Sequence, residues 1–130
     1  MDARGTLRDH MKIYRGYRRM HLSYEGKPIS QKCVVTVSAR PLRQRHDIRR
    51  HSDGFEWGYS GSGPAQLALA LVADCCGRKY AIPAIYQRVK AILVADLPHD
   101  GWSLAQEQIE DAVDKAMQKV GLTVEDLNQP

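Results

Sequence analysis

The sequence has little of what marks membrane, secreted or metal-binding proteins. No stretch approaches the roughly 18 consecutive apolar residues of a membrane-spanning helix, and the first residues are charged, unlike a secretory signal. The three cysteines have no CxxC spacing, and their odd number does not suit a disulfide framework. We therefore expect a cytoplasmic protein with reduced thiols and no metal, cofactor or membrane partner.

A glycine-rich turn at 58–64 lacks the residues that nucleotide-binding and nucleophile loops require. No lysine or arginine lies between Glu56 and Asp74, so the turn cannot be a phosphate-binding P-loop. Gln66 stands at the third glycine position of a dinucleotide fingerprint, and Ser62 replaces the last glycine of a nucleophile elbow. We therefore interpret the turn as structural. The alternative is weak anion binding at a helix start by Gly61, Ser62 and Gly63.

Charge is unevenly distributed along the chain. Residues 1–51 contain 13 lysines and arginines against four acidic residues, whereas residues 52–130 contain six against 11. The net charge of +4 therefore conceals a basic amino-terminal half and an acidic carboxy-terminal half. The first favours an acidic partner, and the second is typical of solvated helix faces.

Arginines are concentrated in the basic half. The segment 39–54 has no apolar periodicity and is expected to be an exposed loop. Tyr14 and Tyr17 alternate with arginines nearer the amino terminus, a combination that suits phosphates and stacked bases. A solvated surface is the alternative, since the segment matches no known nucleic-acid-binding signature. The candidates for binding nucleic acid or an acidic protein surface are Arg15, Arg18, Arg19, Arg40, Arg43, Arg45, Arg49 and Arg50.

The histidines do not predict a metal site. His46 and His51 are five residues apart, which is poor spacing for one helix face, and no cysteine or acid cluster completes a ligand set. His51 could form an acid–base group with Asp53 and Glu56, but only beside a pocket at the glycine turn. We therefore predict no catalytic residue and keep an enzyme as a third hypothesis.

The hydrophobic pattern predicts an α+β fold: a small antiparallel sheet of about four strands, followed by three helices packed on one face. Strands are expected at 12–18, 20–26, 32–38 and 54–60, the last with Phe55, Trp57 and Tyr59 facing the core. Helices are expected at 64–76, 83–97 and 103–120, the first being the central, buried one. A single domain would span 11–122, between a flexible arm at 1–10 and a polar tail at 123–130. An exposed strand edge near 12–18 could allow dimerisation.

The stretch HSDGFEWGYSGSGPAQLALALVADCCG, residues 51–77, resembles a family of bacterial proteins of unknown function found on phages, plasmids and integrative elements. The opening segment Met11 to Gly16 also fits that family, whereas Ser60 stands where a glycine is usual. The resemblance extends to about Val113 and assigns no activity. The motif is carried by Phe55, Trp57, Gly58, Tyr59, Gly61, Ser62, Gly63, Pro64, Gln66, Leu67 and Leu69.

Charge and resemblance together lead to two functional hypotheses. The first is a non-enzymatic accessory protein of a mobile element that binds nucleic acid, or a complex that handles it, through the basic half. Reversing the charge of Arg43, Arg45, Arg49 and Arg50 should then abolish binding. The alternative is an anti-defence inhibitor of the anti-CRISPR type, which binds a host protein complex. In that case the last helix, with Glu107, Glu110, Asp111 and Asp114, would imitate nucleic acid.

Overall fold

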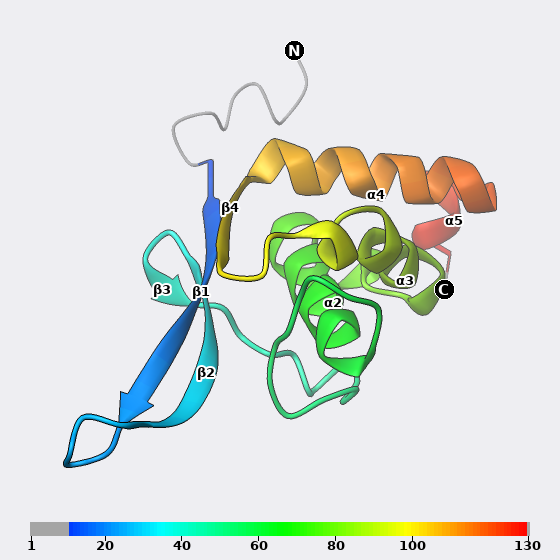
Figure 1. Cartoon of the computed structure of the whole chain (residues 1–130). Helices are drawn as coiled ribbons and strands as arrows, with labels where there is room; N and C mark the ends of the chain where they lie inside the picture. The colour runs from blue at the N-terminus through cyan, green and yellow to red at the C-terminus, as the bar shows by residue number, and fades with distance from the viewer. Residues whose placement is uncertain (1–10, 130) are drawn as a thin grey trace.

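The computed structural model describes residues 11–129, and the flexible arm expected at 1–10 lies outside the described residues. Four antiparallel strands form one sheet in the order β3-β2-β1-β4, with helices on one of its faces (Figure 1). The predicted α+β class is therefore confirmed. The strands are β1 (Ile13–Leu22), β2 (Pro28–Val37), β3 (Arg40–Pro41) and β4 (Gly101–Ala105). The helices are α2 (Ser62–Cys76), α3 (Pro83–Ile92), α4 (Gln106–Val120) and the short α5 (Val124–Leu127), with 3-10 turns η2 (Arg78–Tyr80) and η3 (Val94–Asp96).

Alternation along β1 separates the two faces of the sheet. Tyr14 and Gly16 are buried against the helices, whereas Ile13, Arg15 and Tyr17 are exposed on the opposite side. We call this opposite side the open face. Gly16 is required because a Cβ atom there would lie 2.3 Å from Cε2 of Trp102. The close approach lets the indole cover the inner face of β1.

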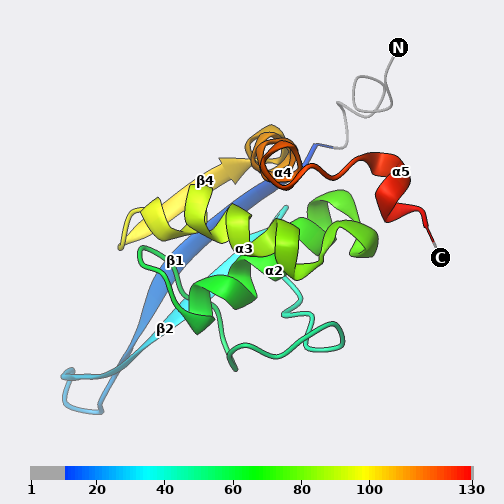
Figure 2. The same cartoon turned by 90° about the vertical axis from the view of Figure 1, so that its right-hand side faces the viewer.

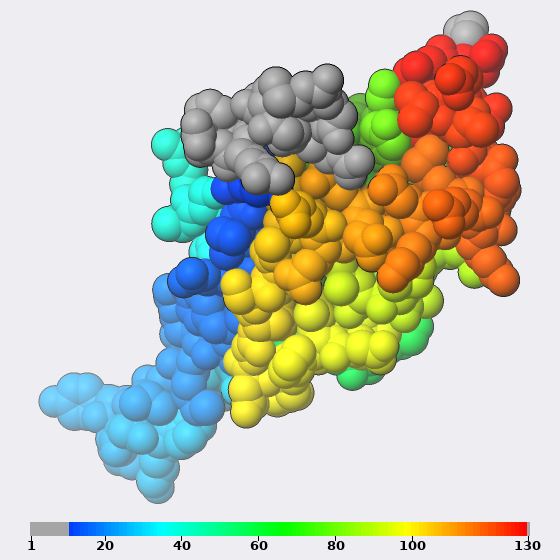
Figure 3. All heavy atoms as spheres, turned by 90° about the horizontal axis from the view of Figure 1, so that it is seen from above, coloured from blue at the N-terminus to red at the C-terminus, as the bar shows by residue number. Residues whose placement is uncertain are grey.

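The outer half of the β1–β2 hairpin projects from the body of the molecule (Figures 2 and 3). β4 pairs only with Ile13–Tyr17, and β3 pairs only with the last two residues of β2. We call residues 18–33 the projecting hairpin. The exposed edge predicted near 12–18 is wrong, because residues 13–17 pair with β2 on one side and with β4 on the other. In the projecting hairpin, by contrast, residues 18–22 of β1 pair with β2 alone, so that part of β1 has a free edge.

The core lies between the sheet and the helices. In α2 every residue from Gly63 to Ala73 is buried, as a helix that is apolar on nearly all sides predicts. α3 adds Ile85 and Val89 to this core, and α4 adds Ile109 and Val113. No helix within residues 11–129 is long and apolar enough to cross a membrane.

The predicted strand at 54–60 is wrong, because these residues form a loop. Phe55 and Trp57 are buried as expected, but Tyr59 is 50% exposed. Gly58 adopts a φ of +85°, which is incompatible with a strand, and its N–H donates to the carbonyl of Val94. Phe55 and Trp57 therefore pack inward here without joining the sheet, and Tyr59 does not.

The fourth strand is β4, which lies where a loop and the start of the last helix were expected. Trp102 and Leu104 are buried between smaller residues, so the segment shows the alternation of a half-buried strand. The following helix starts at Gln106 rather than Ser103, and the Ala105 N–H donates to Oε1 of Gln108 at 2.8 Å. At the carboxyl end, the stretch expected to be a polar tail contains α5, whose Leu127 packs against the core.

Candidate nucleic-acid interface

The open face of the sheet is basic and contains no carboxylate. Arg15, Tyr17 and Arg19 share this face of β1, because they alternate with the inward-facing residues. Lys32 of β2 lies directly opposite Arg19 and was not among the predicted site residues. None of the four strands contains an aspartate or a glutamate. An anion approaching this face therefore meets only cationic, polar and apolar side chains of the sheet.

Arg19 and Lys32 form an unfavourable cross-strand pair. Like charges directly opposite each other destabilise an antiparallel pair, and an anion between them relieves the repulsion. Within residues 11–129, neither of these two side chains nor Arg15 forms an ion pair. Tyr17 is 39% exposed, and its hydroxyl accepts a long hydrogen bond of 3.4 Å from Nη2 of Arg19. The face thus combines free cations with an accessible aromatic ring.

A hollow of about 470 Å³ lies on the same face, where β1 meets the turn that follows β2. Its rim is the two-residue turn Ser38–Ala39, in which both residues have positive φ, as in the tight turns that connect twisted hairpins. The Ser38 N–H donates to the carbonyl of Ile13 at 2.9 Å and holds this rim against β1. The lining residues are Ile13, Arg15, Tyr17, Thr36, Ser38 and Ala39.

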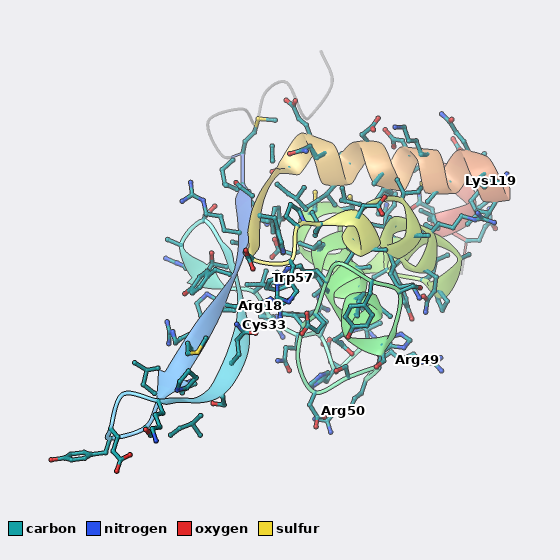
Figure 4. The ribbon with its side chains drawn as sticks, viewed as in Figure 1. Arg18, Cys33, Arg49, Arg50, Trp57 and Lys119 are labelled. Carbon is teal, nitrogen blue, oxygen red and sulfur yellow. The ribbon has the colours of Figure 1, made fainter. Side chains whose placement is uncertain are left out.

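Arg18 has a different environment from its neighbours and does not lie on the open face of the sheet. Its side chain is only 8% exposed, and its guanidinium donates to both carboxylate oxygens of Glu56, at 2.9 and 3.0 Å. It also lies 4.7 Å from the ring centroid of Trp57 and donates to the carbonyl of His99 at 2.7 Å. Figure 4 shows Arg18, Trp57 and Cys33 together between the hairpin and the helices. This arginine therefore joins the hairpin to the core.

The ionisable groups around Arg18 respond to its charge and to burial. The guanidinium hydrogen bonds hold the pKa of Glu56 below its usual value, and the same contact raises the pKa of Arg18. Burial raises the pKa of the Cys33 thiol to about 11, so the thiol is protonated at neutral pH. The cluster is consequently a fixed ion pair beside an unreactive thiol.

The predicted arginine-rich loop is ordered, and part of its charge is neutralised. We call residues 42–54 the arginine loop. Arg45 pairs with Asp47, which also meets Arg78, and Arg50 pairs with Asp53. The exposed arginines Arg40, Arg43 and Arg49 form no ion pair within residues 11–129. Figure 4 places Arg49 and Arg50 well away from the hairpin, so the predicted arginines do not form one patch.

The buried amide of Gln66 holds the arginine loop in place. Its Oε1 accepts the N–H groups of His51 at 2.6 Å and Ser52 at 3.2 Å. Its Nε2 donates to the carbonyls of Gln44 at 2.6 Å and Arg49 at 3.1 Å. Gln66, which stands where a dinucleotide-binding loop would have a glycine, thus stabilises the arginine loop. Its amide is buried, and buried polar groups are almost always hydrogen-bonded.

The groups considered for catalysis are each engaged elsewhere. His51 Nε2 lies 2.7 Å from the hydroxyl of Tyr86, Asp53 pairs with Arg50, and Glu56 pairs with Arg18. Burial lowers the pKa of His51, which favours the neutral imidazole. Residues 11–129 contain no group of three or more His, Cys, Asp or Glu placed to hold a metal ion.

The glycine turn has a packing role that the sequence suggested. A Cβ atom at Gly63 would lie 2.5 Å from Cβ of Glu56, so only glycine lets the loop cross the start of α2 at this distance. The turn thereby holds Glu56 where it meets Arg18. Anion binding by Gly61, Ser62 and Gly63 stays a prediction.

A known protein family matches the part of the chain that contains most of these features. The family of unknown function DUF6166 matches residues 14–115, from β1 into α4. No curated protein and no solved structure matches the chain. The matched region includes the hairpin, the arginine loop and the glycine turn, and it exceeds half of the sequence. The chain therefore belongs to the DUF6166 family.

Proposed function

We propose that the protein binds nucleic acid through the open face of its sheet. The observation that carries the proposal is a sheet without carboxylates, on which Arg15, Arg19 and Lys32 surround the exposed ring of Tyr17. Such cations neutralise phosphates and release counterions, while an aromatic ring offers a stacking surface to a base. From the resemblance, we further propose that the protein acts as an accessory factor of a mobile element in the cytoplasm.

An acidic protein surface would use the same cations but not the aromatic ring. The anti-defence hypothesis places the contact on α4, where Glu107, Asp111 and Asp114 are exposed. Asp111 forms an ion pair with Lys115 at 3.1 Å, which offsets part of the negative charge of that helix. The sheet therefore offers the more uniform charge, and nucleic acid is the partner that we propose.

Charge reversal on the sheet is the direct test. The variant Arg19→Glu/Lys32→Glu is expected to weaken binding of a fluorescent oligonucleotide at least about tenfold at about 50 mM salt. The dependence of affinity on salt should become shallower, by about one unit of log–log slope for each phosphate that the variant no longer neutralises. Fluorescence anisotropy across a salt series measures both quantities.

The matched control is Arg88→Glu/Lys119→Glu, which removes two exposed cations from α3 and α4 and changes the net charge equally. It should bind within about twofold of the wild type, because these positions lie outside the sheet. Equal losses in the two double variants would show that only total charge matters and would contradict the proposed surface. No binding of the wild-type chain at low salt would refute the proposed function and leave a protein partner as the alternative.

A further inference from the structure

We infer that the open face takes single-stranded nucleic acid, with one unpaired base in the hollow and stacked on Tyr17. The inference rests on the proposed function and names the ligand class of that surface. Its starting point is the hollow of about 470 Å³, a volume within the general range of small-molecule sites. The ring of Tyr17 lines this space and stays 39% exposed.

The walls of the hollow match the parts of a nucleotide. Ile13 and Tyr17 supply an apolar and an aromatic surface for the faces of a base. The hydroxyls of Thr36 and Ser38 can donate to or accept from its polar edge. Arg15 lines the same space and can meet the adjoining phosphate. Further out on this face, Arg19 and Lys32 can follow the backbone of the strand.

A double helix does not fit this arrangement. In a duplex each base is stacked on both faces and paired along one edge, so no face is free to contact Tyr17. An unpaired strand presents free base faces, and stacking on an aromatic ring tolerates any base. The tight Ser38–Ala39 turn and its hydrogen bond to Ile13 fix the position of the rim, so that binding need not order it.

The test compares two tyrosines of one hairpin. Tyr17→Leu removes the ring from the hollow, whereas Tyr24→Leu removes a fully exposed ring from the hairpin tip. The probes are labelled single-stranded DNA and RNA of about 12 nucleotides, and the duplex of the same DNA. Single strands are expected to bind the wild type more tightly than the duplex. Tyr17→Leu should weaken single-strand binding roughly ten- to a hundredfold with an unchanged salt slope, and Tyr24→Leu should leave it unchanged.

Two further results decide the case. Tyr17→Trp keeps an aromatic face and should retain single-strand affinity, and the thermal midpoint of each variant shows that the fold is intact. The inference is overturned if the two leucine variants bind alike, or if the duplex binds as tightly as the single strands. In either event the proposed function is judged separately, by the salt dependence of binding and by the Arg19→Glu/Lys32→Glu variant. If the wild type binds none of the probes, both the inference and the proposed function are refuted.

Discussion

Replacing Arg18 with methionine is expected to lower the free energy of unfolding by about 3 kcal/mol, a large fraction of the stability of a small domain. Methionine keeps much of the apolar volume but leaves Glu56, which is half-buried, without its cation. It also removes the donor to the carbonyl of His99 and the cation above the ring of Trp57. Urea unfolding followed by tryptophan fluorescence measures the loss, since Trp57 lies in the cluster.

Two variants isolate the cause of that loss. Arg88→Met removes an exposed arginine from α3 and should change stability by less than about 0.5 kcal/mol. Arg18→Lys keeps the charge but loses the bidentate hydrogen bonding to Glu56, so its stability should lie between that of the wild type and that of Arg18→Met. If Arg18→Met were as stable as Arg88→Met, the cluster would not join the hairpin to the core.

Acid should weaken the same cluster. Because Arg18 lowers the pKa of Glu56 in the folded state, the ion pair stabilises the protein fully above the ordinary glutamate pKa of about 4.3. This contribution is lost as the pH falls from there through the lowered pKa. Urea unfolding at a series of acidic pH values should therefore show a steeper loss for the wild type than for Arg18→Met. If the stabilities of the wild type and Arg18→Met depended equally on pH, the Arg18–Glu56 ion pair would not be the source of the acid sensitivity.

Local patterns predicted much of the fold. The apolar circumference of α2 identified the central helix, and alternation in β2 correctly placed Cys33, Val35 and Val37 on one face. Alternation failed at 54–60, because it marked Phe55 and Trp57 correctly as buried but could not show that Tyr59 is exposed or that the segment forms no strand. Gly58 turns that segment out of the extended conformation, and the place beside β1 is taken by β4.

The sequence predicts only in part which arginines lie on the open face and which face the core. Alternation along β1 separates Arg18 from Arg15 and Arg19, so the two faces could have been distinguished. That Arg18 meets Glu56 depends on a loop far along the chain, which no local pattern predicts. Lys32 was missed because its place opposite Arg19 depends on the register of the hairpin, which is set by the turn and by core packing.

Replacing Gln66 with leucine is expected to release the arginine loop. Leucine has a similar size, so the packing of α2 is kept, but two N–H groups and two carbonyls of the loop lose their buried partner. The loop can regain hydrogen bonds to water only by opening. Cleavage by trypsin after Arg43, Arg45, Arg49 or Arg50 should then accelerate at least about tenfold, and amide exchange at His51 and Ser52 should rise with it.

The control for this prediction is Gln118→Leu, an exposed position on α4 that should leave cleavage of the loop unchanged. Equal rates for the two variants would show that other contacts hold the loop. Oligonucleotide binding by Gln66→Leu adds a separate result, because the open face of the sheet does not include Gln66 or the loop. Unchanged affinity alongside rapid cleavage would place the nucleic-acid contact on the sheet. A loss of affinity in proportion to loop opening would place the arginines of the loop in the interface as well.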